Sequence, residues 1–273
     1  MKPAPFELVR PATLAEASRL LAEGNGSARL VAGCQSLGPM LNLRLATPRV
    51  LIDLTGIPAL TRIEDGPDSV TVGACVTTAY IEDDRLPGRG LDALARIARN
   101  IAYRAVRNRG TMGGSFCHAD PAADWVSTLC VFDAECIVYS NGKQRRIAAD
   151  QFILGAYENA LAPGEILEAI RIPRLPERAS CGYYKVCRKA GEFASALGTV
   201  IHDPSRDRLR AVIGATHSKP IIIPDAKPLM GRDNSLDETA ILALLDRNNI
   251  RDHTARHQQV AALSRAYRQA VSS

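Results

Sequence analysis

The sequence of 273 residues has no long apolar run. No stretch of about 18 consecutive apolar residues occurs, so no segment is predicted to span a membrane. Residues 1–17 contain neither an apolar signal core nor a twin-arginine pair. We therefore expect a cytoplasmic protein, unless a partner carries it elsewhere. Hydrophobic residues make up 46% and charged residues 23% of the chain, which is typical of a globular protein.

Concentrated positive charge is also missing. The formal net charge is +5, but the basic residues are spread along the chain, and the densest groups, at 104–109 and 143–146, are short. A nucleic-acid-binding protein more often has a basic stripe with interleaved aromatic residues. The charge pattern therefore favours a mildly basic, solvated surface over nucleic-acid binding.

The cysteines lack the spacing of a metal or disulfide site. Their number is odd and no pair is spaced as C-x-x-C, which argues against zinc ribbons, ferredoxin-type clusters and secreted disulfide frameworks. We expect most of them to be reduced, small hydrophobic residues, and no iron–sulfur cluster on this chain. The seven cysteines are Cys34, Cys75, Cys117, Cys130, Cys136, Cys181 and Cys187.

Familiar catalytic and nucleotide-binding motifs are absent as well. The sequence contains no G-x-G-x-x-G, no G-x-x-x-x-G-K-[ST] and no G-x-S-x-G, so a Rossmann site, a P-loop and a hydrolase elbow are not supported. His253 and His257 are four residues apart, but no glutamate is placed to complete a zincin motif. We therefore expect no metal site on this chain.

What is present begins with a small βαβ-like unit. Apolar residues recur at helical spacing from Leu14 onward, Thr13 is a plausible N-cap with Glu16 placed as in a capping box, and Gly24 ends the helix. Short strands are predicted at 29–32 and 50–54. The pattern is typical of a βαβ opening to an α+β domain.

The middle of the sequence mixes strands and helices. We predict a strand at 69–74, a helix at 91–102 and a loop at 108–115. A helix then begins with Asp120 as N-cap and Pro121 at its first position. Asn141-Gly142 predicts a hairpin between strands at 135–140 and 144–148, and another strand covers 166–172.

A proline-containing boundary at 173–176 separates this region from the rest. Beyond it the sequence predicts three antiparallel strands at 183–187, 196–202 and 209–215, with a turn at 203–205. Helices are predicted at 236–245 and 254–270. The C-terminal part is therefore expected to be a small sheet with helices.

Two glycine loops are the main candidates for chemistry. The first glycine loop, residues 33–37, follows a strand, and the second glycine loop, residues 111–115, follows a short basic segment. Glycine allows close approach of a backbone to a ligand, and consecutive N–H groups beside Ser or Thr hydroxyls form an anion-binding nest suited to a pyrophosphate. Alone, each loop is more typical of a tight turn.

Polar residues follow the second glycine loop. Asp120 is accounted for as a helix cap. Asp124 has two possible roles: its negative charge is stabilised by the helix dipole in the first turn, or its carboxylate accepts hydrogen bonds from ribose or ribityl hydroxyls. His118 is a candidate ligand, base or flavin attachment point, although a single histidine in a loop is more often structural or exposed.

These segments together resemble a known family. Segment 31–39, with Arg44 and segment 51–54 downstream, is similar to the first FAD loop of the medium subunits of carbon monoxide dehydrogenase and xanthine dehydrogenase-type hydroxylases. Segment 107–124 is similar to their second FAD loop and is long and specific. The resemblance extends over nearly the whole chain, through segments 166–168 and 172–173 to Tyr184, Lys185 and Arg188.

The resemblance implies an α+β protein with a two-part FAD-binding region of the vanillyl-alcohol oxidase (PCMH) type. That region would cover residues 1–176, with subdomains of about 1–56 and 57–176, and a C-terminal domain of a three-stranded antiparallel sheet and a helical bundle would cover 177–273. FAD would be bound without a covalent link, because no covalent-flavin motif is recognisable.

The resemblance also implies roles for individual residues. The two glycine loops would hold the pyrophosphate and adjoining parts of FAD, Asp124 would bind the sugar-alcohol chain, and Leu167 and Lys185 would lie at the flavin ring or the adenine side. The loop residues concerned are Ala32, Gly33, Cys34, Gln35, Ser36, Leu37, Thr111, Met112, Gly113, Gly114 and Ser115.

Three positions depart from the family pattern. Cys34 stands where many relatives have a second glycine, so that turn must be compatible with a Cβ atom. Ser115 replaces a common asparagine but keeps a polar group. Trp125, the only tryptophan, replaces a smaller aliphatic residue, and we expect it to pack in the core and not against the flavin.

In this family the organic substrate is oxidised at a molybdenum cofactor on a large subunit, and electrons cross two [2Fe–2S] clusters on a small subunit. The resemblance therefore implies an oxidoreductase subunit that carries FAD and passes electrons to an external acceptor such as NAD⁺, oxygen or a carrier protein. No catalytic acid or base on this chain is required. A dimer of heterotrimers is the expected assembly.

Two other functions are compatible with the residues. One is a self-contained flavin oxidase or dehydrogenase of the vanillyl-alcohol oxidase type, for which the C-terminal domain looks small. The other is a non-enzymatic assembly or cofactor-insertion protein that retains the fold. Loss of the Gly113-Gly114 pair or of Asp124 would favour the assembly protein, and all three residues are present.

Overall fold

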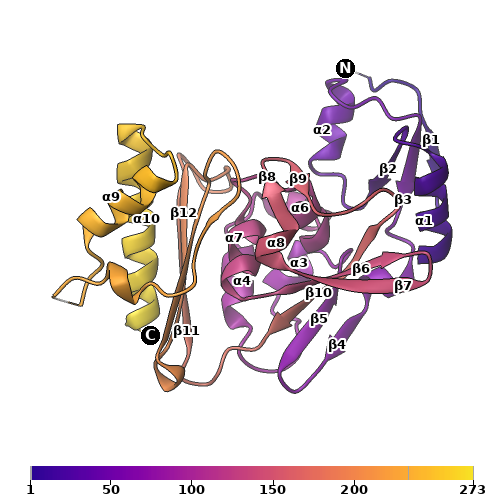
Figure 1. The fold of residues 1–273 in the computed structure, drawn as a ribbon. Helices are drawn as coiled ribbons and strands as arrows, with labels where there is room; N and C mark the ends of the chain where they lie inside the picture. Colours follow the sequence, from indigo (N-terminus) through magenta and orange to yellow (C-terminus); the bar gives the residue numbers. More distant parts are fainter. Residues whose placement is uncertain (1, 233, 273) are drawn as a thin grey trace.

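The computed structural model describes residues 2–232 and 234–272, and within them the main sheets follow one another along the chain. In Figure 1 a small N-terminal sheet and a five-stranded sheet occupy one side of the molecule, and a C-terminal sheet with two helices occupies the other. The predicted α+β class is confirmed.

The N-terminal sheet is parallel, in the order β1-β3-β2. The first helix is the predicted one: Thr13 is its N-cap, and its hydroxyl accepts from the N–H of Glu16 at 3.2 Å. The strand at the start of the chain was not predicted, because its three residues are recognisable only by their pairing with β3. The elements are β1 (Glu7–Val9), α1 (Leu14–Glu23), β2 (Ala28–Val31), α2 (Leu37–Asn42) and β3 (Val50–Asp53).

The five-stranded sheet has the order β4-β5-β10-β6-β7 and is antiparallel. The predicted hairpin is confirmed, because Asn141 and Gly142 both have positive φ, at 47° and 78°, as a tight turn of two residues requires. The strands are β4 (Ile63–Asp65), β5 (Ser69–Gly73), β6 (Glu135–Ser140), β7 (Lys143–Ala148) and β10 (Ile166–Pro173).

Short helices fill the long connection between β5 and β6, and a small hairpin follows β7. The predicted helix at 91–102 ends earlier, at Ala98, and Ala102 takes a left-handed conformation with φ 46°. The elements are α3 (Thr78–Glu82), α4 (Asp92–Ala98), α5 (Arg104–Arg107), α6 (Met112–His118), α7 (Asp124–Val131), α8 (Ala149–Phe152), β8 (Ile153–Gly155) and β9 (Glu158–Asn159), and a further short helix, η1 (Pro58–Thr61), precedes β4.

Two predictions around the second glycine loop are wrong. The segment 108–115 is not a loop throughout, because Thr111 is the N-cap of α6. Asp120 is not the N-cap of the next helix, since α7 begins at Asp124 with Ala123 as its N-cap. The left-handed Ala119, at φ 54°, ends α6, and the Asp120 carboxylate instead accepts from the N–H of Ala122 at 2.9 Å in a separate turn.

The C-terminal sheet has four consecutive antiparallel strands, one more than predicted, with the last helix on one face. That helix lies so close that a Cβ on Gly182 would be 1.8 Å from the carbonyl oxygen of Ala266. The elements are β11 (Ser180–Val186), β12 (Ala196–Asp203), η2 (Pro204–Arg206), β13 (Arg208–Gly214), β14 (Ile221–Ile223), η3 (Lys227–Leu229), α9 (Glu238–Arg247) and α10 (His253–Val271).

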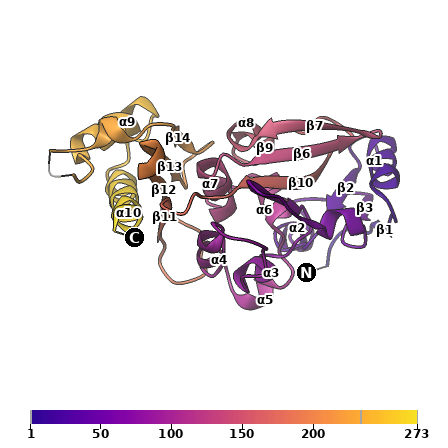
Figure 2. The same cartoon turned by 90° about the horizontal axis from the view of Figure 1, so that it is seen from below.

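Helix α7 lies between the elements before residue 176 and the C-terminal sheet, as Figure 2 shows. All of its residues are buried, and it packs on α6 and α8 on one side and on β12 and β13 on the other. Trp125 on this helix is fully buried and donates from Nε1 to the hydroxyl of Thr78 at 3.3 Å. The expected core position of Trp125 is therefore confirmed.

In the part of the chain that the structure describes, no helix combines the length and the apolar character needed to cross a membrane.

Candidate functional site

The two glycine loops, far apart in the sequence, touch each other. A Cβ on Gly33 would lie 1.9 Å from the carbonyl oxygen of Arg109 and 2.8 Å from Cα of Gly110, which leads into the second glycine loop. A Cβ on Gly114 would lie 3.7 Å from Cβ of Ala32. Only glycine fits at position 33, and this lets the backbones of the two loops lie in contact and form one continuous surface.

The first glycine loop presents a row of backbone donors. Across the described residues, the N–H groups of 33–36 donate no hydrogen bond, whereas the N–H of Gly38 is bonded to the Cys34 carbonyl at 3.0 Å. Cys34 has φ 60°, so the turn adopts the left-handed conformation despite its Cβ atom. Gln35 braces the loop through a bond from Nε2 to the Gly33 carbonyl at 2.8 Å. A row of open N–H groups is what an anionic phosphate group binds.

The second glycine loop is organised differently. The hydroxyl of Thr111 accepts from the Gly114 N–H at 3.0 Å, and the N–H groups of Met112 and Gly113 donate to carbonyls of residues 76 and 74, each at 3.1 Å. The Ser115 N–H donates to the Thr111 carbonyl at 3.1 Å. The N–H groups of residues 112–115 are therefore bonded within the chain, in contrast to those of residues 33–36. The second glycine loop instead leaves space next to the first, because Gly114 is exposed and has no side chain.

Asp124 lies in a buried cluster with Lys185 and Tyr183. The carboxylate is 4% exposed, accepts a hydrogen bond from the Tyr183 hydroxyl, and lies 3.1 Å from Lys185 Nζ. Lys185 Nζ also donates to the carbonyl of Asn100 at 3.2 Å. Burial raises the pKa of Asp124 above its ordinary value, and the positive charge of Lys185 and the hydrogen bonds of Tyr183 and Lys185 oppose that rise.

Leu167 is a core residue whose neighbour in β10 is bonded to the segment that contacts the second glycine loop. It lies on β10 opposite Val138, is 3% exposed, and sits at a register irregularity of the strand. The backbone carbonyl of the next residue, Glu168, accepts from the Ala74 N–H at 2.9 Å, and a Cβ on Gly113 would lie 2.5 Å from Cβ of Ala74. The backbone next to Leu167 is thus connected to the second glycine loop through Ala74, the residue after β5, and the Leu167 side chain belongs to the core.

Sequence reasoning missed an ion pair beside the loops. Arg107 is 9% exposed and donates from Nε and Nη2 to the carboxylate of Glu82, at 2.7 and 2.8 Å. Its Nη1 binds the carbonyls of Ile101 and Ala102. The pKa of Glu82 is held below its ordinary value because Arg107 hydrogen-bonds to it. The sequence hinted at this ion pair only in that Arg107 begins segment 107–124, which resembles the second FAD loop of the family.

The other candidate residues have ordinary roles. All seven cysteines are free, and four of them are buried. Burial raises the pKa of one of these, the Cys75 thiol, to about 12, which makes it unreactive. The His118 ring lies 5.2 Å from the ring of Tyr157. Among residues 2–232 and 234–272, no group of three or more His, Cys, Asp or Glu could hold a metal ion.

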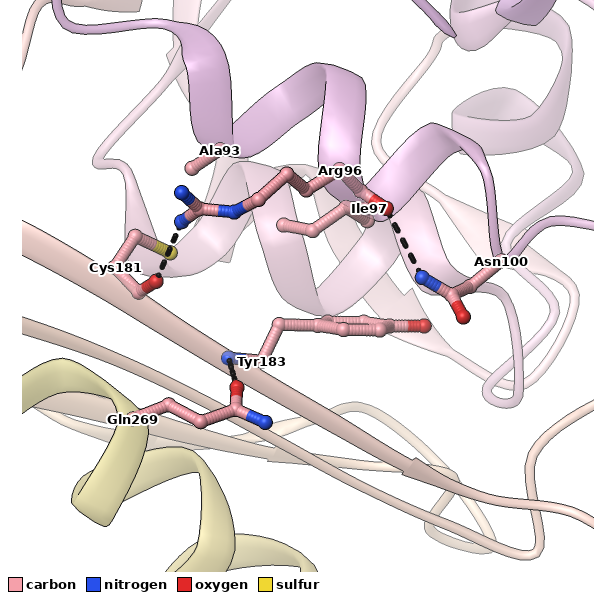
Figure 3. A pocket seen from close by; sticks show the side chains of 7 residues that line it. All are labelled: Ala93, Arg96, Ile97, Asn100, Cys181, Tyr183 and Gln269. Carbon is pink, nitrogen blue, oxygen red and sulfur yellow. Dashed lines mark hydrogen bonds between the residues drawn. The ribbon is translucent and has the colours of Figure 1, made fainter. Parts of the chain in front are cut away.

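A pocket of about 300 Å³ lies beside the buried cluster, between α4 and β11 (Figure 3). Arg96 closes one end by donating to the Cys181 carbonyl at 3.1 Å, and the Tyr183 N–H donates to Gln269 Oε1 at 3.0 Å. The ring of Tyr183 runs along the pocket below Ile97 and Asn100. The pocket is therefore bounded by the same tyrosine that holds Asp124.

Comparison with known families first defines the class of protein. Residues 4–175 match the family described as the FAD binding domain in molybdopterin dehydrogenase. The chain belongs to this family, and it is an FAD-binding oxidoreductase subunit of the molybdenum hydroxylase type. The predicted family, fold class and FAD cofactor are therefore confirmed.

Particular relatives cover most of the chain. It is 34% identical to the nicotine 6-hydroxylase medium subunit of Paenarthrobacter nicotinovorans over 88% of this chain and 85% of the relative. It is 35% identical to the carbon monoxide dehydrogenase medium chain of Afipia carboxidovorans over 88% of this chain and 84% of that one. A carbon monoxide dehydrogenase structure from Hydrogenophaga pseudoflava matches 100% of the chain with a TM-score of 0.91, 28% identity and 99% of its own length covered.

Proposed function

We propose that this chain is the electron-transfer subunit of a molybdenum-containing hydroxylase. It holds FAD without a covalent link, receives electrons from an iron–sulfur subunit and passes them to an external acceptor. The observation that carries the proposal is the contact between the two glycine loops: the exposed Gly114 lies next to Ala32, which leads into residues 33–36, whose N–H groups donate no hydrogen bond within the described chain.

The residues present fit the cofactor. The N–H groups of the first glycine loop suit the negative charge of a pyrophosphate, and the bare backbone at Gly114 leaves room for it to pass. Ala32, Leu37, Thr111 and Ser115 also belong to the proposed site; a Cβ on Gly114 would lie 3.7 Å from Cβ of Ala32, and the Thr111 hydroxyl accepts from the Gly114 N–H. When bound, FAD supplies the redox chemistry, and the chain contributes binding and orientation.

Asp124 and Lys185 form the second part of the proposed site. A carboxylate has about four lone-pair positions, of which Tyr183 and Lys185 occupy part, so it retains capacity for a sugar-alcohol hydroxyl. The near-complete burial of Asp124 means that only a group held directly against it can use that capacity. Leu167 acts from the core by supporting the second glycine loop.

The proposed partners are a small subunit with two [2Fe–2S] clusters and a large subunit with a molybdenum cofactor, doubled into a symmetric assembly. Support comes from the names of the relatives, which are medium subunits or chains of dehydrogenases and hydroxylases. The organic substrate would be oxidised on the large subunit, so no residue of this chain is proposed as a catalytic acid or base.

Reconstitution tests this proposal. The purified chain is expected to bind one FAD, to release it into the supernatant on acid precipitation, and to leave organic substrates unchanged. Adding the two partner subunits is expected to produce substrate-dependent bleaching of the flavin. Turnover of an organic substrate by the chain alone at about 1 s⁻¹ or faster, a rate typical of competent enzymes, would contradict the subunit role. Flavin in the acid pellet would contradict non-covalent binding.

A further inference from the structure

Tyr183 joins the C-terminal sheet to the first turn of α7. It lies on β11 opposite Thr199 of β12, and its N–H is bonded to Gln269 of α10 at 3.0 Å. Figure 3 shows its ring lying against Ile97 and Asn100 of the α4 region. Its backbone is thus bonded to the strand and to α10, and at the far end of the ring its hydroxyl donates to Oδ1 of Asp124.

Tyr183 fixes the orientation of the Asp124 carboxylate, which Lys185 does not do. Lys185 Nζ lies 3.1 Å from both Oδ1 and Oδ2 of Asp124, so the ammonium group attracts the two oxygens equally. An ammonium is a compact charge with rotatable donors and does not define the plane of a carboxylate. The hydroxyl of Tyr183 bonds to Oδ1 alone, and the hydrogen bond of Lys185 goes to Oδ2, so Tyr183 distinguishes the two oxygens and each of them can still accept a further bond.

We propose that Tyr183 is a positioning residue for FAD binding, holding the carboxylate of Asp124 in the orientation in which it accepts from the cofactor's sugar-alcohol chain. This inference rests on the proposed function. In this proposal the effect of Tyr183 on the cofactor passes through its hydrogen bond to Asp124.

The same contact influences the charge of Asp124. The groups that face the Asp124 carboxylate are Lys185 and Tyr183, and the other titratable group near Tyr183 is Cys187. A hydrogen bond donated to the ionised carboxylate favours that form, so it lowers the pKa of Asp124 against the effect of burial. Without the hydroxyl, Asp124 takes up a proton at higher pH, and FAD binding is lost at higher pH as the solution is acidified.

The test is a set of FAD titrations of the full 273-residue chain across the acid pH range. Tyr183→Phe is expected to weaken FAD binding about tenfold near neutral pH, which corresponds to about 1.4 kcal/mol, and to move the acid limit of binding to higher pH. Tyr184→Phe is the matched control, because the next tyrosine on the strand has its hydroxyl on Arg265 of α10. That variant is expected to bind FAD as the wild type does.

A double-mutant cycle shows whether Tyr183 acts through Asp124. In an Asp124→Asn background, Tyr183→Phe is expected to cause no further loss of FAD affinity, because residues acting through one contact are not additive. Additive losses would overturn the inference, and so would a loss of affinity in Tyr183→Phe with an unmoved acid limit, since a merely structural role predicts that result.

A loop variant separates this inference from the proposed site. Gly114→Val alters the second glycine loop and leaves the Asp124 cluster intact. If Gly114→Val loses FAD while Tyr183→Phe keeps wild-type affinity, the role of Tyr183 is refuted and the loop site stands. If Gly114→Val also keeps wild-type affinity, the proposed FAD site is wrong, and the inference falls with it.

Discussion

Gly33→Ala tests whether the two glycine loops must touch for FAD to bind. The substitution adds one methyl group at the point where a Cβ would be 1.9 Å from the carbonyl oxygen of Arg109. Cβ atoms essentially never come within 3.0 Å of such an atom, so the two backbones must separate by about 1.1 Å or more. The clash is with backbone on both sides, so no side chain can rotate to relieve it.

The magnitude follows from two effects. Overpacking of this kind costs about 1–3 kcal/mol of folding stability. Separating the loops also moves the row of N–H donors away from Gly114, so we expect FAD affinity to fall at least about tenfold, or about 1.4 kcal/mol. Both effects come from one methyl group, but they are measured separately.

The matched control is Gly56→Ala. Gly56 has no heavy atom within 4 Å of where its Cβ would lie, so the same methyl group meets open space there. FAD affinity is measured by titrating the apoprotein and following the quenching of flavin fluorescence, and stability is measured by urea denaturation. The control is expected to match the wild type in both.

One result would refute the reasoning. If Gly33→Ala loses stability as expected but binds FAD within about twofold of the Gly56→Ala control, the contact between the loops serves folding alone. The site would then have to be built from the first glycine loop without the second.

Three further predictions concern single residues near the loops. Cys34→Gly is expected to raise the free energy of unfolding by about 0.5–1 kcal/mol, because position 34 has φ 60°; a destabilised variant in urea denaturation would contradict this. Gly114→Val, whose Cβ would lie 2.7 Å from the hydroxyl of Thr111, is expected to purify without flavin absorbance; a yellow protein would argue against the pyrophosphate position. Glu82→Gln is expected to cost about 2 kcal/mol at neutral pH by removing one partner of a largely buried pair. Because the folded-state pKa of Glu82 is lowered, its stabilisation is present above the ordinary value of 4.5 and is lost as pH falls through the folded-state pKa. The wild type should therefore lose its advantage over the variant in denaturation curves recorded at decreasing pH, and a constant difference would refute this reading.

Local signals in the sequence predicted those parts of the fold that depend on neighbouring residues. Thr13 caps its helix, and Asn141-Gly142 makes its hairpin, because both effects act over a few residues. The strands β1 and β14 were missed because three residues each carry too little pattern, and pairing with distant strands defines them. Asp120 was misassigned because the preceding left-handed Ala119 moves the helix start.

The site was predictable to a different extent. The family resemblance of segment 107–124 indicated FAD, and comparison confirms that cofactor. The pairing of the second glycine loop with residues 74 and 76 was not visible, because those hydrogen bonds join segments that only the folded chain brings together. Tyr183 was missed for the same reason, since its partner Asp124 lies on another element.

The fully enclosed α7 limits how this protein could exchange parts with its relatives. The match to the FAD binding domain family ends at residue 175, where a hybrid with a relative would be joined. Yet Ser127 of α7 lies where a Cβ on Gly214 would be 1.9 Å from its hydroxyl, so this helix is fitted to the strand beyond that point. In a hybrid joined at residue 175, α7 would pack on the C-terminal sheet of another protein. A residue larger than glycine at position 214 of that sheet would clash with Ser127. Substitutions on the two sides are therefore expected to arise as compensating pairs, and the two halves to be inherited together.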